Sequence, residues 1–445
     1  MKVLLASHFF PPGHIGGTEV LTLSLAKGLI GLGCEVEVIC NEGWDSAQHQ
    51  GLIVTNEVYD GVPVCRLHFN WQKAPDIFLY LYNNPEVYQF FKEYMMAHKP
   101  DILHVTSCYS LSASMISAAY DLGIKVLLTA TDFWFVCAKN TLMKGNGDLC
   151  PGQESAYECT RCLAGEQKFF KLTSRMLPRS LHRNLIESLG KRSFISNLPG
   201  FRGLYGDWET RFRFMESSLE KVSRIITASN LLRDLFIRYG VPGEKIYHSS
   251  YGLDTSWAEN FQEKEPSSEL RIGFIGQISP AKGPDLLIRA VASLSRSSPL
   301  KVKIYGDLSK DREYGRQLVE LAGSDARVSF MGTFENSKMG EVLAGIDVLA
   351  VPSVWYDFPL VIPSAFATRT PVIATNLPGM NELVTHGVNG LLFERYNWSD
   401  LASIIQGLLE KPEMIHQLRQ GIKSPKTVGE MCREYLMFYR ALLEA

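Results

Sequence analysis

Short apolar runs alternate with helical segments along nearly the whole chain, and this alternation constrains the fold more than any other feature. Apolar runs of roughly four to eight residues bounded by turn signals are typical of buried parallel strands. Strands that alternate with helices predict a doubly wound parallel sheet. The expected strands are residues 3–7, 35–40, 63–68, 102–105, 126–129 and 224–228, then 272–275, 302–305, 328–330, 348–351, 372–374 and 390–393. Helical patterns lie between them, for example at 17–32 and 111–122.

A polar stretch without apolar periodicity, residues 258–268, divides this alternation into two halves. We therefore expect an α/β protein with two Rossmann-like domains, residues 1–257 and 268–425, that face a cleft. Ligands of open α/β sheets bind beyond the carboxyl ends of the strands, so a site is expected in the loops that follow the strands. The first half carries an insertion at about residues 137–215, and an amphipathic helix is expected at about 426–445.

The composition is that of an ordinary globular protein: 445 residues, 46% hydrophobic and 21% charged, enough for two or three domains. The net charge of −2 gives no global field that would attract nucleic acid. Met1 and Lys2 run into an apolar strand without a cleavage site, and no window approaches the ~18 apolar residues of a membrane span. Nine cysteines in so long a chain argue against a disulfide scaffold, so a cytoplasmic location is expected.

Residues 347–382 combine the features of a ligand site. The strand 348–351 ends at Pro352, and an aromatic, acidic loop follows at 355–358. A short helix is expected from near Leu360 to near Arg369. Backbone N–H groups in a first helical turn lack partners and the helix dipole is positive there, so this loop suits an anion.

This stretch resembles the donor-binding segment of the retaining GT-B glycosyltransferases of family four, which typically reads Glu-x-Phe-Gly-Leu-Val-x-x-Glu-Ala. Asp357 replaces the first glutamate together with its neighbour, and would bind sugar hydroxyls. Ser364 stands in place of the second glutamate and would face the ribose, while Pro359 replaces the glycine and removes one N–H donor. The resemblance implies a nucleotide-sugar donor bound by Tyr356, Asp357, Phe358, Leu360, Val361 and Ser364.

A glycine-containing loop follows the first strand of each half. The second of them, residues 276–283, resembles the family's Gly-Arg-Leu-x-x-x-Lys-Gly motif, whose two cations neutralise the departing diphosphate. Lys282 matches the lysine, and Gln277 replaces the arginine. Gly16 and Gly17 lie in a loop with two prolines and a glutamate, and this loop resembles the family's diphosphate loop. Paired glycines at a helix start let backbone N–H groups approach a phosphate closely. The alternative for the loop of Gly16 and Gly17 is a plain strand–helix turn. The alternative for Lys282 is an ordinary solvated loop lysine.

Thr131 and Asp132 follow the strand at 126–129, where relatives often carry His-Asp. A threonine can hydrogen-bond a sugar hydroxyl but cannot accept a proton near neutral pH. Asp132 has two interpretations, since it would either orient the acceptor or cap a helix. Thr333 follows the strand at 328–330 and would lie beside the nucleotide base in the resembled fold.

The resemblance covers nearly the whole chain and implies metal-independent, retaining transfer from a nucleoside-diphosphate sugar, with UDP-glucose as the first guess. The acceptor would be a glycan or a lipid-linked saccharide of polysaccharide biosynthesis, and no cofactor would be required. Lys282, Asp357, Thr131 and Asp132 would form the catalytic group, and the last helix would cross back to the N-terminal domain. The residues do not specify the base, the sugar, the acceptor or the linkage.

Two other functions compete with this one. Thr131, Gln277 and the missing glutamate pair motivate a sugar-nucleotide-binding protein that has lost catalysis. A different Rossmann-type enzyme, such as an epimerase working with a nicotinamide, is disfavoured because the sequence lacks Gly-x-Gly-x-x-Gly.

Four cysteines cluster in the insertion: Cys137, Cys150, Cys159 and Cys162. A Cys-x-x-Cys pair preceded by two more cysteines in a polar, glycine-rich segment suits tetrahedral Zn²⁺. Four thiolates would close the coordination sphere, so the zinc would be structural. An iron–sulfur cluster, a disulfide pair or free thiols are the alternatives.

The part of the insertion at 167–202 is basic and apolar together. Leu177, Leu181, Leu185 and Leu189 recur every four residues and predict one helical stripe. Such a face would suit an anionic membrane surface and a lipid-linked acceptor, as a peripheral contact on the inner side of the membrane. The alternative is a helical hairpin packed on the N-terminal domain with solvated lysines.

Overall fold

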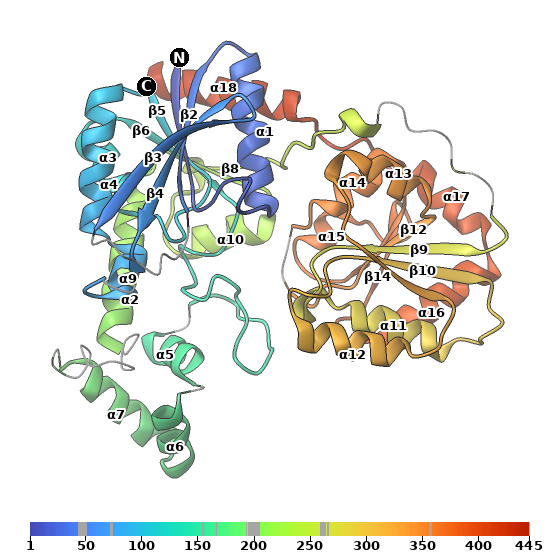
Figure 1. The fold of residues 1–445 in the computed structure, drawn as a ribbon. Helices are drawn as coiled ribbons and strands as arrows, with labels where there is room; N and C mark the ends of the chain where they lie inside the picture. The colour runs from blue at the N-terminus through green and yellow to red at the C-terminus, as the bar shows by residue number, and fades with distance from the viewer. Residues whose placement is uncertain are drawn as a thin grey trace. The chain divides into compact units, whose positions relative to one another are not determined.

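The computed structural model describes residues 1–42, 51–71, 74–153, 155–165, 167–192, 194, 205–258, 264, 267–355 and 358–444. They form two compact units, Met1–Tyr251 with Val428–Ala445, and Gly252–Thr427 (Figure 1). Within the described ranges, no helix combines the length and the apolar character needed to cross a membrane.

The first unit is built on an eight-stranded sheet of order β3-β4-β2-β1-β5-β6-β7-β8. Every neighbouring pair is parallel except β3 with β4. The strands β3 and β8 were not expected, because β3 is an exposed edge strand without an apolar run and β8 has only three residues. The bounds are β1 (Lys2–Ser7), β2 (Glu35–Asn41), β3 (Leu52–Tyr59), β4 (Val62–Phe69), β5 (Ile102–Val105), β6 (Lys125–Ala130), β7 (Arg224–Thr227) and β8 (Ile246–His248).

Helices of the first unit alternate with these strands. The helix expected at 111–122 begins only at Ser114, because Ser110 and Ser112 have positive φ angles of 60° and 61° that no α-helix accommodates. The bounds are α1 (Gly17–Gly31), α2 (Ile77–Tyr82), α3 (Pro85–His98), α4 (Ser114–Asp121), α5 (Ala156–Ala164), α6 (Lys168–Met176), α7 (Arg179–Gly190), α9 (Tyr205–Lys221) and α10 (Asn230–Arg238).

The C-terminal helix α18 (Val428–Glu444) belongs to the core of the first unit, where it packs on α1 (Figure 1). A Cβ on Gly28 would lie 2.4 Å from the Cys432 sulfur, so the close approach of the two helices requires a glycine there. The ring of His104, in β5, lies 2.5 Å from the Tyr439 hydroxyl and 2.8 Å from Thr129 Oγ1. Burial lowers the pKa of His104 to about 3, so this core histidine is neutral.

The second unit is built on a six-stranded sheet of order β11-β10-β9-β12-β13-β14, with parallel pairs throughout. Its strands are β9 (Leu270–Ile275), β10 (Leu300–Tyr305), β11 (Val328–Gly332), β12 (Val348–Val351), β13 (Val372–Thr375) and β14 (Gly390–Phe393). Its helices are α11 (Pro284–Ser293), α12 (Arg312–Ala322), α13 (Met339–Ala344), α14 (Val361–Ala367), α15 (Met380–Leu383), α16 (Trp398–Glu410) and α17 (Glu413–Gln420).

The order of connection reverses between β1 and β5 in the first sheet and between β9 and β12 in the second. Crevices at such switch points bind ligands at the carboxyl ends of the strands. The boundary between the units falls at Tyr251 and not at residue 257, because Leu253 pairs with the end of the second unit: its N–H donates to the Lys426 carbonyl at 2.9 Å.

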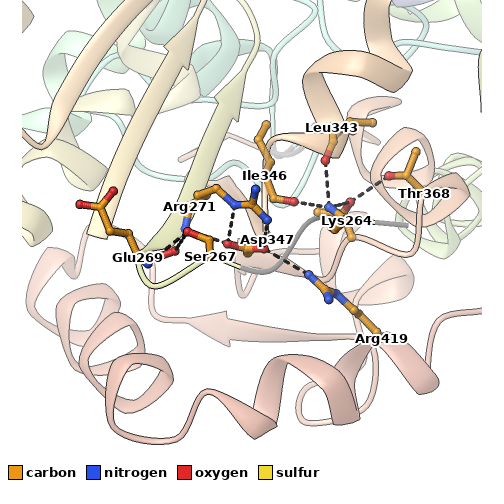
Figure 2. Close-up of polar contacts among 10 residues, drawn as sticks. Lys264, Ser267, Glu269, Arg271, Leu343, Ile346, Asp347, Thr368 and Arg419 are labelled. Carbon is orange, nitrogen blue, oxygen red and sulfur yellow. Dashed lines mark hydrogen bonds and ion pairs between the residues drawn. The ribbon is translucent and has the colours of Figure 1, made fainter. Parts of the chain in front are cut away.

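Lys264 lies in the stretch that we expected to be a polar linker, yet it is anchored in the second unit (Figure 2). Its ammonium donates to the carbonyls of Leu343, at 2.9 Å, and Ile346, and to Thr370 Oγ1 at 2.6 Å. Beside it, Asp347 accepts from Arg271 at 2.8 Å and Arg419 at 3.3 Å. Asp347 directly precedes β12 and Thr370 precedes β13, so this cluster stands at the amino edge of the sheet, opposite the edge where ligands bind.

Replacing Lys264 with methionine is expected to change the pH dependence of stability. Burial, aided by the charge of Arg419, lowers the pKa of Lys264 from 10.5 to about 7. Between these values the unfolded chain binds a proton that the folded chain lacks, so the free energy of unfolding rises with pH there. Each pKa unit is worth about 1.4 kcal/mol. Between pH 7 and 10, the unfolding free energy of the wild type, measured by urea denaturation, should therefore rise by about a few kcal/mol relative to that of Lys264→Met. Lys411→Met, at an exposed site, should show no such gain, and parallel curves for wild type and Lys264→Met would refute the assignment.

Candidate functional site

The loops after β9 and β12 meet at the switch point of the second sheet. The carbonyl of Ala281, in the first loop, accepts from the Val354 N–H at 2.9 Å and from Ser353 Oγ at 3.0 Å. Both partners belong to the second loop. The two loops are therefore fixed to each other by backbone and hydroxyl hydrogen bonds.

Gly283 lets these loops approach so closely. Its φ is +65°, and a Cβ there would lie 2.2 Å from the Pro352 carbonyl oxygen. A side chain would be strained in the left-handed region and would also collide with the backbone of the second loop. The position accepts only glycine without a rearrangement.

Lys282 precedes this glycine, at the end of the short helix η4 (Pro280–Lys282). Its ammonium lies 5.5 Å from the centroid of the Trp355 ring, a cation–π distance. Gln277, from the same loop, is exposed. The structure thus holds one amine at the carboxyl edge, against an aromatic ring of the neighbouring loop.

A second cation at this edge was missed by the sequence analysis. Arg395 follows β14, and its Nε donates to the Val354 carbonyl at 2.7 Å. Its guanidinium also stacks on Tyr396, 4.3 Å from the ring centroid. The sequence did contain a signal for Arg395, because it follows a buried strand and one acidic residue. The family resemblance, however, pointed only to position 277, where Gln277 replaces the arginine.

The other predicted donor residues of this unit have different surroundings. Tyr356 and Asp357 lie outside the described residues, while Phe358, Leu360 and Val361 are half-buried at the start of α14. Ser364 is only 5% exposed, and its hydroxyl donates to the Leu360 carbonyl at 2.9 Å within its own helix. Thr333 is exposed just beyond β11.

In the first unit, Gly16 and Gly17 are exposed at the start of α1, where the carboxylate of Glu19 turns back toward them. A Cβ on Gly16 would lie 2.6 Å from Glu19 Oε2, and His8 Nε2 lies 3.2 Å from Oε1. Burial by itself raises the pKa of Glu19, but the hydrogen bond and charge of His8 and the N–H groups of Glu19 and Gly16 outweigh it, and the pKa is lowered. An anion of the chain itself thus occupies part of this helix start.

Thr131 and Asp132 are held at the carboxyl edge of the first sheet. Thr131 Oγ1 donates to the Thr106 carbonyl at 2.8 Å and accepts from Thr18 Oγ1 at 2.9 Å. Asp132 accepts from Ser107 Oγ at 2.7 Å and from the Trp134 N–H at 3.0 Å. Asp132 therefore bonds to the turn that follows β6, and it caps no helix, because residues 131–137 form bends and turns.

The four cysteines of the insertion line a single cavity of about 450 Å³. None forms a disulfide. Burial, reinforced by the neighbouring thiols, raises the pKa of Cys159 to about 12. Across the described residues, which include Cys137, Cys150, Cys159 and Cys162, no three His, Cys, Asp or Glu side chains are grouped so as to hold a metal ion.

The leucine stripe expected in the insertion does not lie on one helix. Pro178 separates α6 from α7, and the buried positions of α7 are His182, Ile186 and Gly190, each one residue after a leucine of the stripe. Leu181 is exposed in consequence. The hairpin has its own small core, and its outer face is both basic and apolar.

Two family models match the chain. The model described as Glycosyltransferase Family 4 matches residues 15–148, in the first unit. The model described as Glycosyl transferases group 1 matches residues 255–424, which make up nearly all of the second unit.

Curated relatives match over shorter stretches. The D-inositol 3-phosphate glycosyltransferase of Rhodococcus opacus is 36% identical over 157 residues, which are 34% of this chain and 35% of the relative. An uncharacterized glycosyltransferase of Methanocaldococcus jannaschii is 24% identical over 259 residues, 54% of this chain and 66% of the relative. The match to the Rhodococcus protein therefore spans about a third of its length.

Solved structures match over the full length. HepE of Anabaena in complex with UDP has a TM-score of 0.64 at 18% identity, covering 99% of this chain and 100% of that one. Sucrose-phosphate synthase from Thermosynechococcus elongatus has a TM-score of 0.66 at 17% identity, covering 100% and 99%. At these identities the likeness shows the fold, which is GT-B with two parallel-sheet α/β domains.

Proposed function

We propose that the protein is a retaining glycosyltransferase acting on a nucleoside-diphosphate sugar, because each unit of the chain matches a glycosyltransferase family model. The observation that carries the proposal is the fixed pair of loops at the β9–β12 switch point, with Lys282 between them. UDP-glucose is our first donor, because HepE, which shares the fold, is known in complex with UDP and with UDP-glucose. The acceptor is a glycan or a lipid-linked saccharide, as in polysaccharide biosynthesis.

The donor diphosphate lies beside Lys282 in this proposal. As the bond between the anomeric carbon and the phosphate oxygen breaks, negative charge develops on the departing diphosphate, and a fixed cation stabilises it. Arg395 supplies a second positive charge from the same edge, which offsets the replacement of the family's arginine by Gln277. The donor site is completed by Tyr356, Asp357 and the backbone N–H groups of Phe358, Leu360 and Val361. In this proposal Ser364 and Thr333 lie toward the nucleoside.

The acceptor hydroxyl attacks the anomeric carbon from the face that the diphosphate leaves, so the new bond keeps the configuration of the old one. Its proton passes to the departing phosphate oxygen, because Thr131 has no basic group to take it. The Asp132 carboxylate accepts two hydrogen bonds within the chain and retains lone pairs that can orient an acceptor hydroxyl. Neither step uses a metal ion.

A panel of nucleotide sugars, incubated with the intact chain, tests this function. The expected result is an upward shift of the melting temperature with one donor and, once an acceptor is supplied, release of its nucleoside diphosphate. A melting shift without release, across a range of glycan acceptors, would favour the alternative of a sugar-nucleotide-binding protein without catalysis. No shift with any member of the panel would refute the proposal.

We also propose that α6 brings the protein to an anionic lipid surface, where a lipid-linked acceptor would be found. Residues 167–192 contain seven lysines and arginines and one acidic residue, Glu187. On α6, Lys168, Lys171 and Arg175 flank Leu172 and Met176, which are 60% and 72% exposed. Exposed apolar side chains favour such binding because they can enter the headgroup region. Each cation near an anionic leaflet adds about 1 kcal/mol of favourable binding energy.

Flotation of the intact chain with vesicles checks this contact. The protein should float with vesicles that contain phosphatidylglycerol and stay behind with pure phosphatidylcholine. The triple change of Lys168, Lys171 and Arg175 to glutamine should abolish flotation, whereas the same charge loss at the exposed Lys310, Lys411 and Lys423 should leave it intact. Failure of the unchanged protein to float with anionic vesicles would refute the membrane contact but leave the donor site untouched.

A further inference from the structure

The four cysteines come from two parts of the insertion, and little regular secondary structure connects these parts. Cys137 and Cys150 lie between β6 and α5, where the described residues form turns and one isolated bridge, Met143 with Leu149. Cys159 and Cys162 lie on α5, three positions apart and hence on one face of the helix. All four nevertheless line the same cavity of about 450 Å³.

The helices next to this cavity have a very small core. The buried residues of their hydrophobic cluster are Tyr157, Ala164, Phe170 and Ile186. Elements with so little buried apolar area are usually stabilised by a disulfide or a structural metal. None of the cysteines of the chain is in a disulfide.

A cation close to Cys137 and Cys159 is buried, and it forms no ion pair with any of the described residues. Arg211, from α9, is 1% exposed and stacks on Trp134, 4.6 Å from the ring centroid. It donates one hydrogen bond, to the Trp134 carbonyl, while its Nε and Nη1 have no partner in the described part of the chain. The indole nitrogen of Trp208, a residue of the cavity wall, is also buried without a partner. Buried charges are normally paired, so these atoms indicate a missing anionic group.

We propose that Cys137, Cys150, Cys159 and Cys162 bind one Zn²⁺ ion and so fasten the connection after β6 to α5. The four thiols would each release a proton, and the resulting tetrathiolate would carry two net negative charges. Arg211 and two basic residues of the cavity wall, Lys139 and Lys144, would balance this charge, whereas Arg161 already pairs with Glu158 of the same wall at 3.2 Å. Four protein ligands close the tetrahedral sphere, so the ion is structural.

The sulfurs are not grouped as ligands in this structure, and the cavity supplies the space in which they can converge on an ion. Cys150 Sγ donates to the Gly152 carbonyl at 3.0 Å and Cys162 Sγ to the Met143 carbonyl at 3.6 Å. Zinc binding would exchange these weak thiol hydrogen bonds for metal–sulfur bonds. The inference is independent of the glycosyltransferase proposal, since its test does not use activity.

Elemental analysis of the intact chain, purified without chelator, is the first test. About one zinc per chain is expected, and the Cys159→Ser and Cys162→Ser variants should lose it. Cys34→Ala, which changes a cysteine outside the cluster, should keep the metal. Zinc retained by both serine variants would contradict the ligand assignment.

A second measurement covers the case in which the serine variants fail to fold. Unmodified protein freed of metal by a chelator is titrated with Co²⁺, and thiolate-to-cobalt charge-transfer absorption should saturate near one equivalent. Arg211→Met should weaken this binding at least several-fold. The proposal is overturned if the purified protein contains no zinc and cobalt gives no thiolate absorption. It is equally overturned if iron with the visible absorption of a cluster is found instead.

Discussion

Replacing Lys282 with alanine should lower kcat by roughly 100- to 1,000-fold, because the loss of one preorganised stabilising group typically has that effect on the chemical step. Lys282 is held against Trp355 at the switch point, where the departing diphosphate would gain charge. The same charge is present in the bound donor to a smaller extent, so KM for the donor should rise less than kcat falls. Initial rates of nucleoside diphosphate release give both constants.

Two controls separate this role from a general loss of charge. Lys282→Arg keeps the cation and should retain more activity than Lys282→Ala. Lys411→Ala removes an exposed lysine at the end of α16 and should leave both constants unchanged. If Lys282→Ala turned over donor as fast as the wild type, the diphosphate would have to lie elsewhere.

Replacing Gly283 with alanine should destabilise the second unit and weaken donor binding together. The left-handed conformation costs a non-glycine residue about 1–2 kcal/mol, and forcing an extra methyl group into filled space typically costs another 1–3 kcal/mol. The clash here is with a backbone oxygen, Pro352 O at 2.2 Å, so one of the two loops must move. We therefore expect a loss of roughly 2–5 kcal/mol in unfolding free energy, with a raised KM for the donor.

Gly387→Ala is the matched control. Gly387 also has a positive φ, +76°, but a Cβ there would meet nothing within 4 Å. This variant should therefore lose only the conformational part, about 1–2 kcal/mol, with unchanged donor binding. Equal losses in the two variants, measured by urea denaturation, would show that the contact with Pro352 does not matter.

The sequence predicted the fold well wherever strands are buried. In the second sheet, β12 and β13 are fully buried apolar runs. All the strands of this sheet lie close to their expected bounds, including β11, most of whose residues are exposed or half-buried. The edge strand β3 carries no such run, since most of its residues are exposed. The boundary of the units depends on the pairing of Leu253 with Lys426, a contact between distant residues that no local pattern encodes.

Site residues were harder to predict, because contacts decide what each side chain can do. Lys282 and Gly283 were identified by their match to a family motif and by its position after a strand, but the contacts of their loop with Pro352 and Ser353 depend on the neighbouring loop. Arg395 reaches the same edge from β14, more than a hundred residues away along the chain, and matched no motif. The hydroxyl of Thr131 is already bonded to Thr106 and Thr18, which the motif alone did not reveal.

A crystal structure of the intact chain with bound UDP would test the central claim most directly. The diphosphate is expected at the carboxyl ends of β9 and β12, with its oxygens within hydrogen-bond distance of the Lys282 amine. UDP bound at any other place in the molecule, or a diphosphate out of reach of Lys282, would contradict the account.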